Sequence, residues 1–179
     1  MNFDAGRTLT TERLLLRPFD AADTDDLFEA TKDAEIMRWM PWAPGQTTAQ
    51  ARDWCIVHAH ADPDQQVNFA VVVDDRCSGA IGLSRASWGT GRVEIGYWMA
   101  PWARRRGYAV EATRAVAAYA FQKGLYRVEL LAATGNVASQ RVAERAGFTR
   151  EGVLREALMV PGGRSDAVLF SLLKGDNSR

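Results

Sequence analysis

The chain has 179 residues, and its 22 basic and 22 acidic side chains cancel to a formal charge of zero. Hydrophobic residues make up 47% and charged residues 25%, a balance typical of a soluble globular domain and not of a disordered or collagen-like chain. This length suits one domain with a sizeable core, so we expect residues 1–179 to form a single domain. The neutral charge argues against general binding to nucleic acid or to an anionic membrane.

The N-terminal residues contain no apolar stretch of the kind found in a signal peptide, and no segment approaches the ~18 apolar residues that span a bilayer. The two cysteines, Cys55 and Cys77, are therefore expected to be reduced thiols in a cytoplasmic protein. Cys55, His58 and His60 offer a weak metal-site reading, but residues two apart on a helix face different sides. We expect no metal.

Apolar spacing in the first third of the chain predicts a strand followed by two helices. The strand is expected over Leu9–Arg17, the first helix over Ala21–Met37 and the second from Thr47 or Thr48 to His60. Pro18 ends the strand, and Asp20 or Asp23 can cap the helix that follows. A loop interrupted by prolines separates the two helices.

From residue 66 the pattern changes to strands joined by short turns, which predicts an antiparallel meander. The expected strands cover residues 67–73, 78–83 and 92–100. After them come a helix over Tyr108–Lys123, a strand over Arg127–Ala133, a helix over Val137–Ala146, and a hairpin of residues 152–159 and 166–173. The sequence therefore predicts one mixed α+β domain.

An arginine-rich turn, Arg104-Arg105-Arg106-Gly107-Tyr108-Ala109, joins the third strand of the meander to the next helix. Free amide N–H groups at a helix start, together with the helix dipole, bind anions such as phosphate. Gly107 has no Cβ to hold a phosphate away from those amides, and the arginines add positive charge. The alternative is a solvated basic turn, because the common nucleotide fingerprints are absent.

Two spaced motifs go beyond a basic turn. Arg104-x-x-Gly107-x-Ala109 resembles the (Gln/Arg)-x-x-Gly-x-(Gly/Ala) signature of the GCN5-related N-acetyltransferases, the GNAT superfamily. The stretch from Asn136 through Ser139 to Gly147-Phe148 is similar to the Asn-x-x-Ser/Ala segment of that superfamily. In addition, the stretch from Thr11 to Arg17 and the Met40-Pro41-Trp42 loop resemble the RimJ/RimL-like ribosomal-protein N-terminal acetyltransferases.

The resemblance implies a GNAT fold. We expect a mixed, mostly antiparallel central sheet of six to seven strands, flanked by about four helices. The fourth strand is expected to be splayed and to form the acetyl-CoA cleft. Acetyl-CoA is the implied cosubstrate, with no metal.

The resemblance also implies which residues hold acetyl-CoA. Amides of the arginine-rich turn would bind its pyrophosphate, and the backbone of the fourth strand would pair with its pantetheine arm. The residues implied are Trp98, Met99, Ala100, Arg104, Arg105, Arg106, Gly107, Tyr108, Ala109, Asn136 and Ser139. For Asn136, a helix N-cap is a second and compatible role.

The catalytic residues implied are Glu94 and Ser139. Glu94 sits near the position where several superfamily members carry a glutamate base, although it could pair with Arg92 or Arg127 or face solvent. The tyrosine that many members use to protonate the leaving thiolate is replaced here by Ala143. Ser139 is what the RimJ/RimL-like group offers instead, although a serine in the first turn of a helix often bonds to the backbone.

The implied function is direct transfer of an acetyl group to a primary amine, expected to be a protein or peptide N-terminal α-amine. Trp39 and Trp42 are candidates for the wall of the acceptor site, with packing as the alternative for each. A small-molecule amine acceptor (an amino acid, a polyamine or an antibiotic) and a non-catalytic acyl-CoA sensor stay open. No nucleic-acid or membrane partner is expected, and a homodimer is left open.

Overall fold

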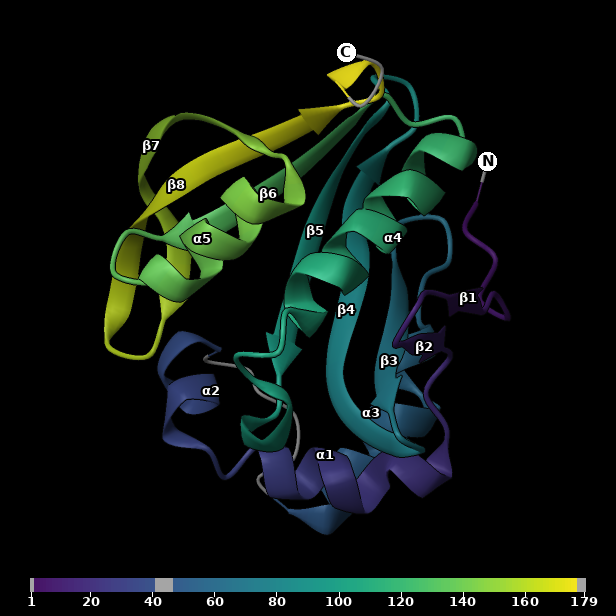
Figure 1. Cartoon of the computed structure of the whole chain (residues 1–179). Coiled ribbons are helices and arrows are strands. Elements are labelled where there is room, and N and C mark those ends of the chain that lie inside the picture. Colours follow the sequence, from purple (N-terminus) through teal and green to yellow (C-terminus); the bar gives the residue numbers. More distant parts are fainter. Residues whose placement is uncertain (1, 41–46, 177–179) are drawn as a thin grey trace.

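In the computed structural model, which describes residues 2–40 and 47–176, one mixed sheet runs through the molecule with helices packed on both faces (Figure 1). Its eight strands lie in the order β1-β2-β3-β4-β5-β6-β8-β7. Their bounds are β1 Leu9–Thr10, β2 Leu15–Arg17, β3 Val67–Val73, β4 Arg76–Ser87, β5 Arg92–Met99, β6 Arg127–Ala133, β7 Thr149–Val160 and β8 Gly163–Leu173. Every strand pair is antiparallel except β5 with β6. The predicted α+β class and the meander are confirmed.

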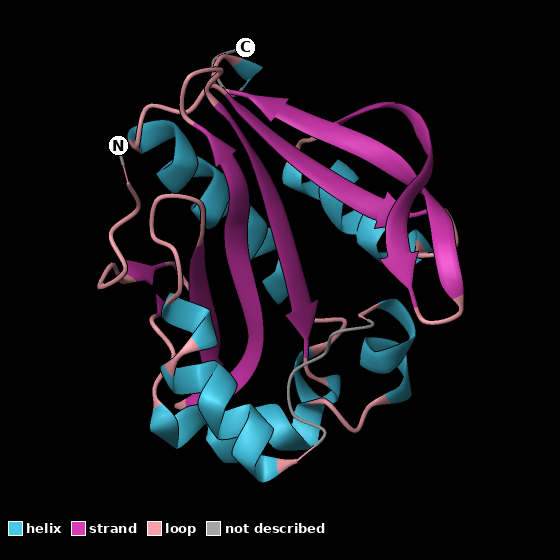
Figure 2. Cartoon of the chain, turned by 180° about the vertical axis from the view of Figure 1, so that it is seen from behind, coloured by secondary structure: helices cyan, strands magenta, loops and turns pink. Residues whose placement is uncertain are grey.

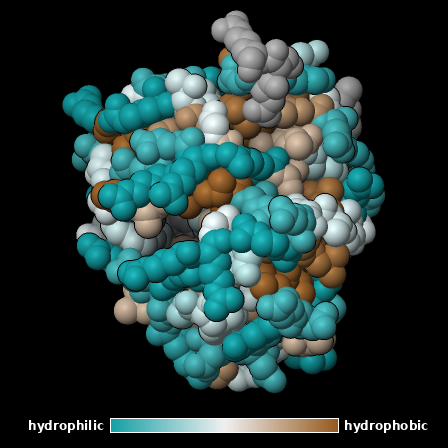
Figure 3. Space-filling model, in the orientation of Figure 1, coloured by the Kyte–Doolittle hydropathy of each residue, from teal (hydrophilic) through white to brown (hydrophobic). Residues whose placement is uncertain are grey.

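Five α-helices accompany the sheet within the described residues: α1 Thr24–Ala30, α2 Ala34–Trp39, α3 Thr48–Ile56, α4 Tyr108–Gln122 and α5 Val137–Ala146. The core between the sheet and α4 with α5 includes Val116, Val93 and Leu130. A second core packs α1 and α3 against the other face, with Leu27 and Cys55 fully buried. The face that carries α4 and α5 is mostly hydrophilic at its surface (Figure 3). None of the helices in the described ranges is long and apolar enough to cross a bilayer.

The predicted strand over Leu9–Arg17 is wrong in one respect: it is two short antiparallel strands, β1 and β2. Between them Thr11 closes a tight turn, because its N–H donates to the Leu14 carbonyl (3.0 Å) and its Oγ1 accepts from the Leu14 N–H (3.0 Å). The sheet therefore has eight strands where six to seven were expected.

The predicted helix over Ala21–Met37 is likewise divided. It consists of a 3₁₀ turn over Ala21–Asp23, then α1, then α2. Asp20 caps the first turn as expected, but a second cap lies inside the predicted helix. There the Asp33 carboxylate accepts a hydrogen bond from the Ile36 N–H (3.0 Å), which starts a new helix.

The helix predicted to reach His60 ends earlier. α3 is capped by Thr47 and stops at Ile56, where Val57 leaves helical geometry. His58–His60 form a separate 3₁₀ turn. From β3 onward the predicted elements are confirmed, with β4, β7 and β8 longer than expected; β6 and α5 have the expected bounds.

The parallel contact between β5 and β6 is short. Arg92, Val93 and Glu94 lie opposite Arg127, Val128 and Glu129, and the pairing stops there. Beyond that point the two strands diverge, as Figure 2 shows from behind. β5 is the fourth strand of the predicted series, so the expected splay is present.

Candidate active site

A cleft of about 600 Å³ lies where β5 and β6 diverge. Residues of β4 and β5 line one side of it and residues of β6 and α5 line the other, so it separates strands β1–β5 from strands β6–β8. Side chains named below that line it are Trp39, Trp54, His58, Arg85, Glu94, Tyr97, Trp98, Asn136 and Ser139. The structure thus brings the predicted catalytic pair and part of the predicted cofactor set to a single cleft.

Glu94 projects from β5 into this cleft and is about one-fifth exposed (22%). Its Oε2 lies 2.9 Å from Nη1 of Arg85, on the neighbouring strand. Arg85 sits at an irregularity in the β4–β5 pairing and has a positive φ of 54°. A bulge of this kind redirects a side chain, and here it places the guanidinium beside Glu94.

Neither of the ion pairs considered as alternatives for Glu94, with Arg92 or with Arg127, is formed. Arg92 and Arg127 both lie against Glu129, at 3.7 and 2.7 Å, and Arg127 also pairs with Glu151. Arg127 and Glu129 lie on the same face of β6, because residues two apart on a strand share a face. The parallel register places Arg92 opposite Arg127, so Arg92 also lies beside Glu129.

Ser139 lies in the first turn of α5 and has two polar contacts. Its N–H donates to Oδ1 of Asn136 (3.1 Å), which is the N-cap of the helix, as the motif predicts. Its Oγ lies 3.2 Å from the Tyr97 hydroxyl, and the two hydroxyls share a hydrogen bond. Burial raises the pKa of Tyr97 to about 12, with the Ser139 hydrogen bond acting in the opposite direction. Ala143 is fully buried.

Gly107 caps the N-terminus of α4 in the left-handed region, at φ +82°. An L-residue is strained in that conformation, which explains the glycine. The turn is held from outside by Arg13, whose Nη1 donates to the Arg106 carbonyl (2.9 Å) and whose guanidinium pairs with Glu111 (2.6 Å). Thr11 also donates to Glu111 (2.6 Å), so the β1–β2 turn holds the first turn of α4 in place.

The three arginines of the turn have different surroundings. Arg104 is tied into the protein: its Nε donates to the Met99 carbonyl (3.1 Å), and its Nη2 lies 2.5 Å from Oδ1 of Asp33. The hydrogen bond from Arg104 lowers the pKa of Asp33. Arg105 and Arg106 are exposed.

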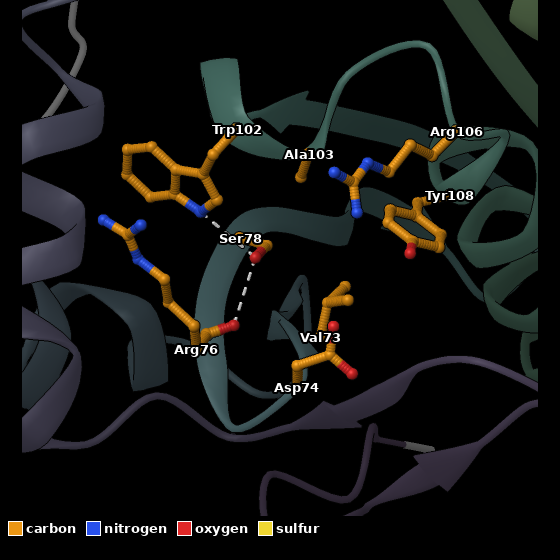
Figure 4. Close-up of a pocket in the computed structure, with 8 residues that line it drawn as sticks. All are labelled: Val73, Asp74, Arg76, Ser78, Trp102, Ala103, Arg106 and Tyr108. Carbon is orange, nitrogen blue, oxygen red and sulfur yellow. Dashed lines mark hydrogen bonds between the residues drawn. The ribbon is translucent and has the colours of Figure 1, made fainter.

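A second, smaller pocket of about 160 Å³ lies beside the arginine-rich turn (Figure 4). Arg106 and Tyr108 line one side of it, and Trp102 lies across from them. Trp102 is fixed in place, because its Nε1 donates to Ser78 Oγ (3.2 Å) and the Arg76 guanidinium lies 3.7 Å from the centre of the ring.

The remaining predicted cofactor residues follow the end of β5. Trp98 and Met99 are buried and paired with β4 at Ala80 and Gly79. The Ala100 N–H donates to the Ser78 carbonyl (2.9 Å). On its other side this part of β5 has no ladder partner within the described residues, since pairing with β6 ends at Glu94. Ala109 follows Tyr108 in the first turn of α4.

Of the two predicted acceptor residues, Trp39 lines the cleft. It packs over Gly135, where an added Cβ would come within 3.2 Å of the indole. Its Nε1 donates to Glu35 (3.3 Å). Trp42 lies outside the described residues. Trp54, from α3, also lines the cleft and stacks edge-on against Phe19.

Of the side chains considered for a metal, the two histidines have other partners. Nε2 of His58 lies 3.0 Å from Asp53, and Nε2 of His60 lies 2.9 Å from the Phe19 carbonyl oxygen. Burial raises the pKa of Cys55 and of Cys77 to about 12. Such thiols stay protonated and unreactive. Across residues 2–40 and 47–176 there is no cluster of three or more potential ligands.

The family model described as "Acetyltransferase (GNAT) domain" matches residues 13–149, which include the arginine-rich turn, the cleft strands and α5. The chain belongs to the GNAT acetyltransferase family. It is therefore a transferase, as the motifs imply.

Two curated relatives cover nearly the whole of this acetyltransferase. The uncharacterized N-acetyltransferase p20 of Bacillus licheniformis is 32% identical over 171 residues, 93% of this chain and 96% of the relative. The putative ribosomal N-acetyltransferase YdaF of Bacillus subtilis is 32% identical over 169 residues, 89% of each chain. Mycobacterium smegmatis RimJ, solved in complex with CoA-disulfide, has a TM-score of 0.87 at 20% identity, covering 100% of this chain and 93% of RimJ. That structure supports the fold.

Sequence reasoning missed three residues that shape the site of this acetyltransferase: Arg85, Tyr97 and Asp33. Arg85 reaches Glu94 through a strand irregularity that has no sequence signature. Tyr97 directly precedes the predicted cofactor residue Trp98, but nothing local relates it to Ser139, 42 positions away. Asp33 was detectable, because an aspartate just before a helix is a cap signal in the sequence. In the structure its side chain accepts a hydrogen bond from the Ile36 N–H.

Proposed function

We propose that this acetyltransferase transfers the acetyl group of acetyl-CoA directly to the N-terminal α-amine of a peptide or protein. The observation that carries the proposal is that Glu94 and Ser139 line one cleft, at the point where β5 and β6 diverge. A thioester and an amine can therefore bind side by side in this cleft. Direct transfer requires one group that takes a proton from the amine and another that protonates the leaving thiolate.

The residues present fit acetyl-CoA. The free amides at the start of α4, around Gly107, suit its pyrophosphate, with Arg105 and Arg106 adding charge. The unpaired side of β5 at Trp98–Ala100 suits the amide groups of the pantetheine arm. Tyr108 and Ala109 belong to the same first turn of α4. In this proposal Arg104 acts by holding the turn against Asp33, and Asn136 holds Ser139 beside the arm.

In the reaction, the amine nitrogen forms a bond to the acetyl carbonyl carbon, and the C–S bond breaks with its electron pair going to sulfur. Glu94 accepts the proton that the amine loses and passes it to solvent. Ser139 gives its hydroxyl proton to the thiolate and is reprotonated in the same step, with solvent as the final source of that proton. Roles of this kind contribute on the order of 10²- to 10⁴-fold each.

The charge of the cleft favours an acceptor with one amino group. Among the described lining residues Glu94 is the one carboxylate, and Arg85 already pairs with it. A polyamine carries several ammonium groups and would leave most of them without a partner. The lining of the cleft also includes Trp39, Trp54 and Met159, which suit the first side chain of a peptide. YdaF's description as a putative ribosomal N-acetyltransferase points to the same acceptor class.

The test is thiol release from acetyl-CoA over a panel of acceptors: peptides with free Ala, Ser or Met N-termini, amino acids, polyamines and aminoglycosides. The same peptides with blocked N-termini are the matched control, because they keep every other group. We expect release with free peptides and none with blocked ones. Release confined to small amines would overturn the peptide assignment. Acetyl-CoA binding, measured by calorimetry, without release from any acceptor would favour the sensor reading.

A further inference from the structure

The Tyr97 hydroxyl and Ser139 Oγ meet inside the cleft, from β5 and α5 respectively. A hydrogen bond joins the two hydroxyls at 3.2 Å, and within the described residues it is the single hydrogen bond of Ser139 Oγ. A hydroxyl has one proton and two lone pairs, and it rotates to suit its partners. With the Tyr97 proton directed at Oγ, the serine's own proton is available to an acceptor in the cleft.

The serine is also fixed from its backbone side. Asn136 accepts the Ser139 N–H (3.1 Å), which sets the first turn of α5 relative to the strand before it. Tyr97 lies on β5 opposite Ile81 of β4, beyond the point where the pairing of β5 with β6 ends. A strand on one side and a capped helix on the other therefore hold the two hydroxyls.

We propose that Tyr97 is the positioning residue for Ser139. By donating to Oγ, it turns the serine proton away from itself and toward the thioester sulfur. The proposal rests on the proposed function, in which Ser139 protonates the leaving thiolate. It also supplies a use for a phenol in a chain that has Ala143 at the position of the superfamily's usual tyrosine.

Burial raises the pKa of Tyr97 to about 12, so the phenol is protonated before the reaction and can donate to Oγ. As the C–S bond breaks, the serine proton moves to sulfur and the Tyr97 proton moves to Oγ, because a phenol is a stronger acid than an aliphatic alcohol. No alkoxide is left on Ser139. Solvent restores the Tyr97 proton after CoA leaves.

The first experiment needs no turnover. It measures the pH at which the thiol of CoA bound to the protein ionises, followed by the rate of its alkylation with iodoacetamide. If Ser139 donates to sulfur, the bound thiolate is stabilised and its pKa is lower in the native protein than in Ser139→Ala. Tyr97→Phe should shift that pKa upward by about one unit, toward the Ser139→Ala value. Equal values in all three proteins would overturn the proposal. The protein's own Cys55 and Cys77 are buried and protonated, so they do not interfere.

The second experiment is a double-mutant cycle on kcat. We expect about a 10-fold loss for Tyr97→Phe and about a 100-fold loss for Ser139→Ala, with the KM for acetyl-CoA within about twofold of native. The double variant should be no slower than Ser139→Ala, because the two hydroxyls act as a unit. Losses that multiply would contradict positioning and indicate two separate roles.

Two further variants keep the result interpretable. Tyr126→Phe removes a phenol from an exposed tyrosine (65%) outside the cleft and should leave kcat unchanged. Ser139→Thr keeps a hydroxyl and should retain most of the turnover when Tyr97 is present. It should lose that turnover when Tyr97 is replaced by Phe. If no acceptor is acetylated by the native protein, the proposed function fails, and the thiol titration still decides the role of Tyr97.

Discussion

The guanidinium of Arg104 lies 2.5 Å from the carboxylate of Asp33, so the turn before α4 is tied to the start of α2. The same carboxylate caps α2 by accepting the Ile36 N–H. α2 ends at Trp39, which lines the cleft. The turn implied for the cosubstrate and the wall proposed for the acceptor therefore share one carboxylate.

Replacing Asp33 separates its two functions. Asn keeps the cap and loses the charge, whereas Ala loses both. We expect Asp33→Ala to lower the free energy of unfolding by about 1–2 kcal/mol, and Asp33→Asn to lower it by less. Urea denaturation of both variants measures the difference. Equal losses would mean that the cap contributes nothing and that the Arg104 ion pair carries the whole effect.

Replacing Glu94 by Gln removes the proposed proton acceptor while keeping size and polarity. We expect kcat to fall by about 10²- to 10⁴-fold, with the affinity for acetyl-CoA unchanged. Glu144→Gln, which alters an exposed carboxyl on α5, is the control. The ion pair of Glu94 with Arg85 does not complicate this test, because the Arg85 side chain is 71% exposed and solvent screens such pairs, so that losing the pair should cost little stability. Native-like turnover in Glu94→Gln would assign the base elsewhere.

Gly107 is required by its backbone conformation, at φ +82°. Gly107→Ala should cost about 1–2 kcal/mol of strain and should also weaken acetyl-CoA binding by tenfold or so. Gly162→Ala is a matched control, since Gly162 has φ +99° in the β7–β8 turn and is exposed. It should lose similar stability and keep full affinity, as measured by thermal unfolding and calorimetry. A loss of affinity in both variants would point to a general effect on the fold.

The free energy of unfolding at acid pH should depend in part on Glu151. Hydrogen bonds from Arg127 and Ser171 hold the pKa of Glu151 at about 2, below its ordinary value of ~4.3. Since the folded state favours the ionised form, the group stabilises the fold above about pH 4.3 and loses that contribution as the pH falls toward 2. The stability gap between the native protein and Glu151→Gln should therefore narrow over this range in urea titrations.

Glu12→Gln provides the comparison for that measurement, because Glu12 is exposed and has no ion pair in the described part of the chain. Its stability difference from the native protein, measured over the same pH range, is the reference for Glu151→Gln. A gap for Glu151→Gln that changed no more than this reference would show that the Arg127 contact contributes nothing to folding.

The sequence predicted the second half of the fold closely because its signals are local. Glycines close α4 and α5, and α5 and β6 have the expected bounds. The first half was less predictable. Thr11 and Asp33 each interrupt an element through a side-chain hydrogen bond to the backbone, and a run of suitable residues does not show whether such a bond forms.

The site was predictable where a motif marks it, and less so where contacts are long-range. Ser139 and Gly107 were named from their motifs and Glu94 from its position relative to the superfamily's glutamate base, and the fold brings Glu94 and Ser139 to the same cleft. The Arg85 and Tyr97 contacts depend on strand register and on how far β5 and β6 diverge. Those quantities are set by packing of the whole sheet, so no short pattern encodes them.

Only three residue pairs join β5 to β6, so the sheet is nearly two sheets hinged along one short seam. A molecule that lies in the cleft and forms hydrogen bonds to the free side of β5 would connect the β1–β5 part of the sheet to the β6–β8 part. Amide hydrogens along Ile95–Met99 should then exchange more slowly when CoA is bound, and the halves should unfold together rather than in turn. A cosubstrate bound across this short pairing would therefore stabilise the fold as well as take part in the chemistry.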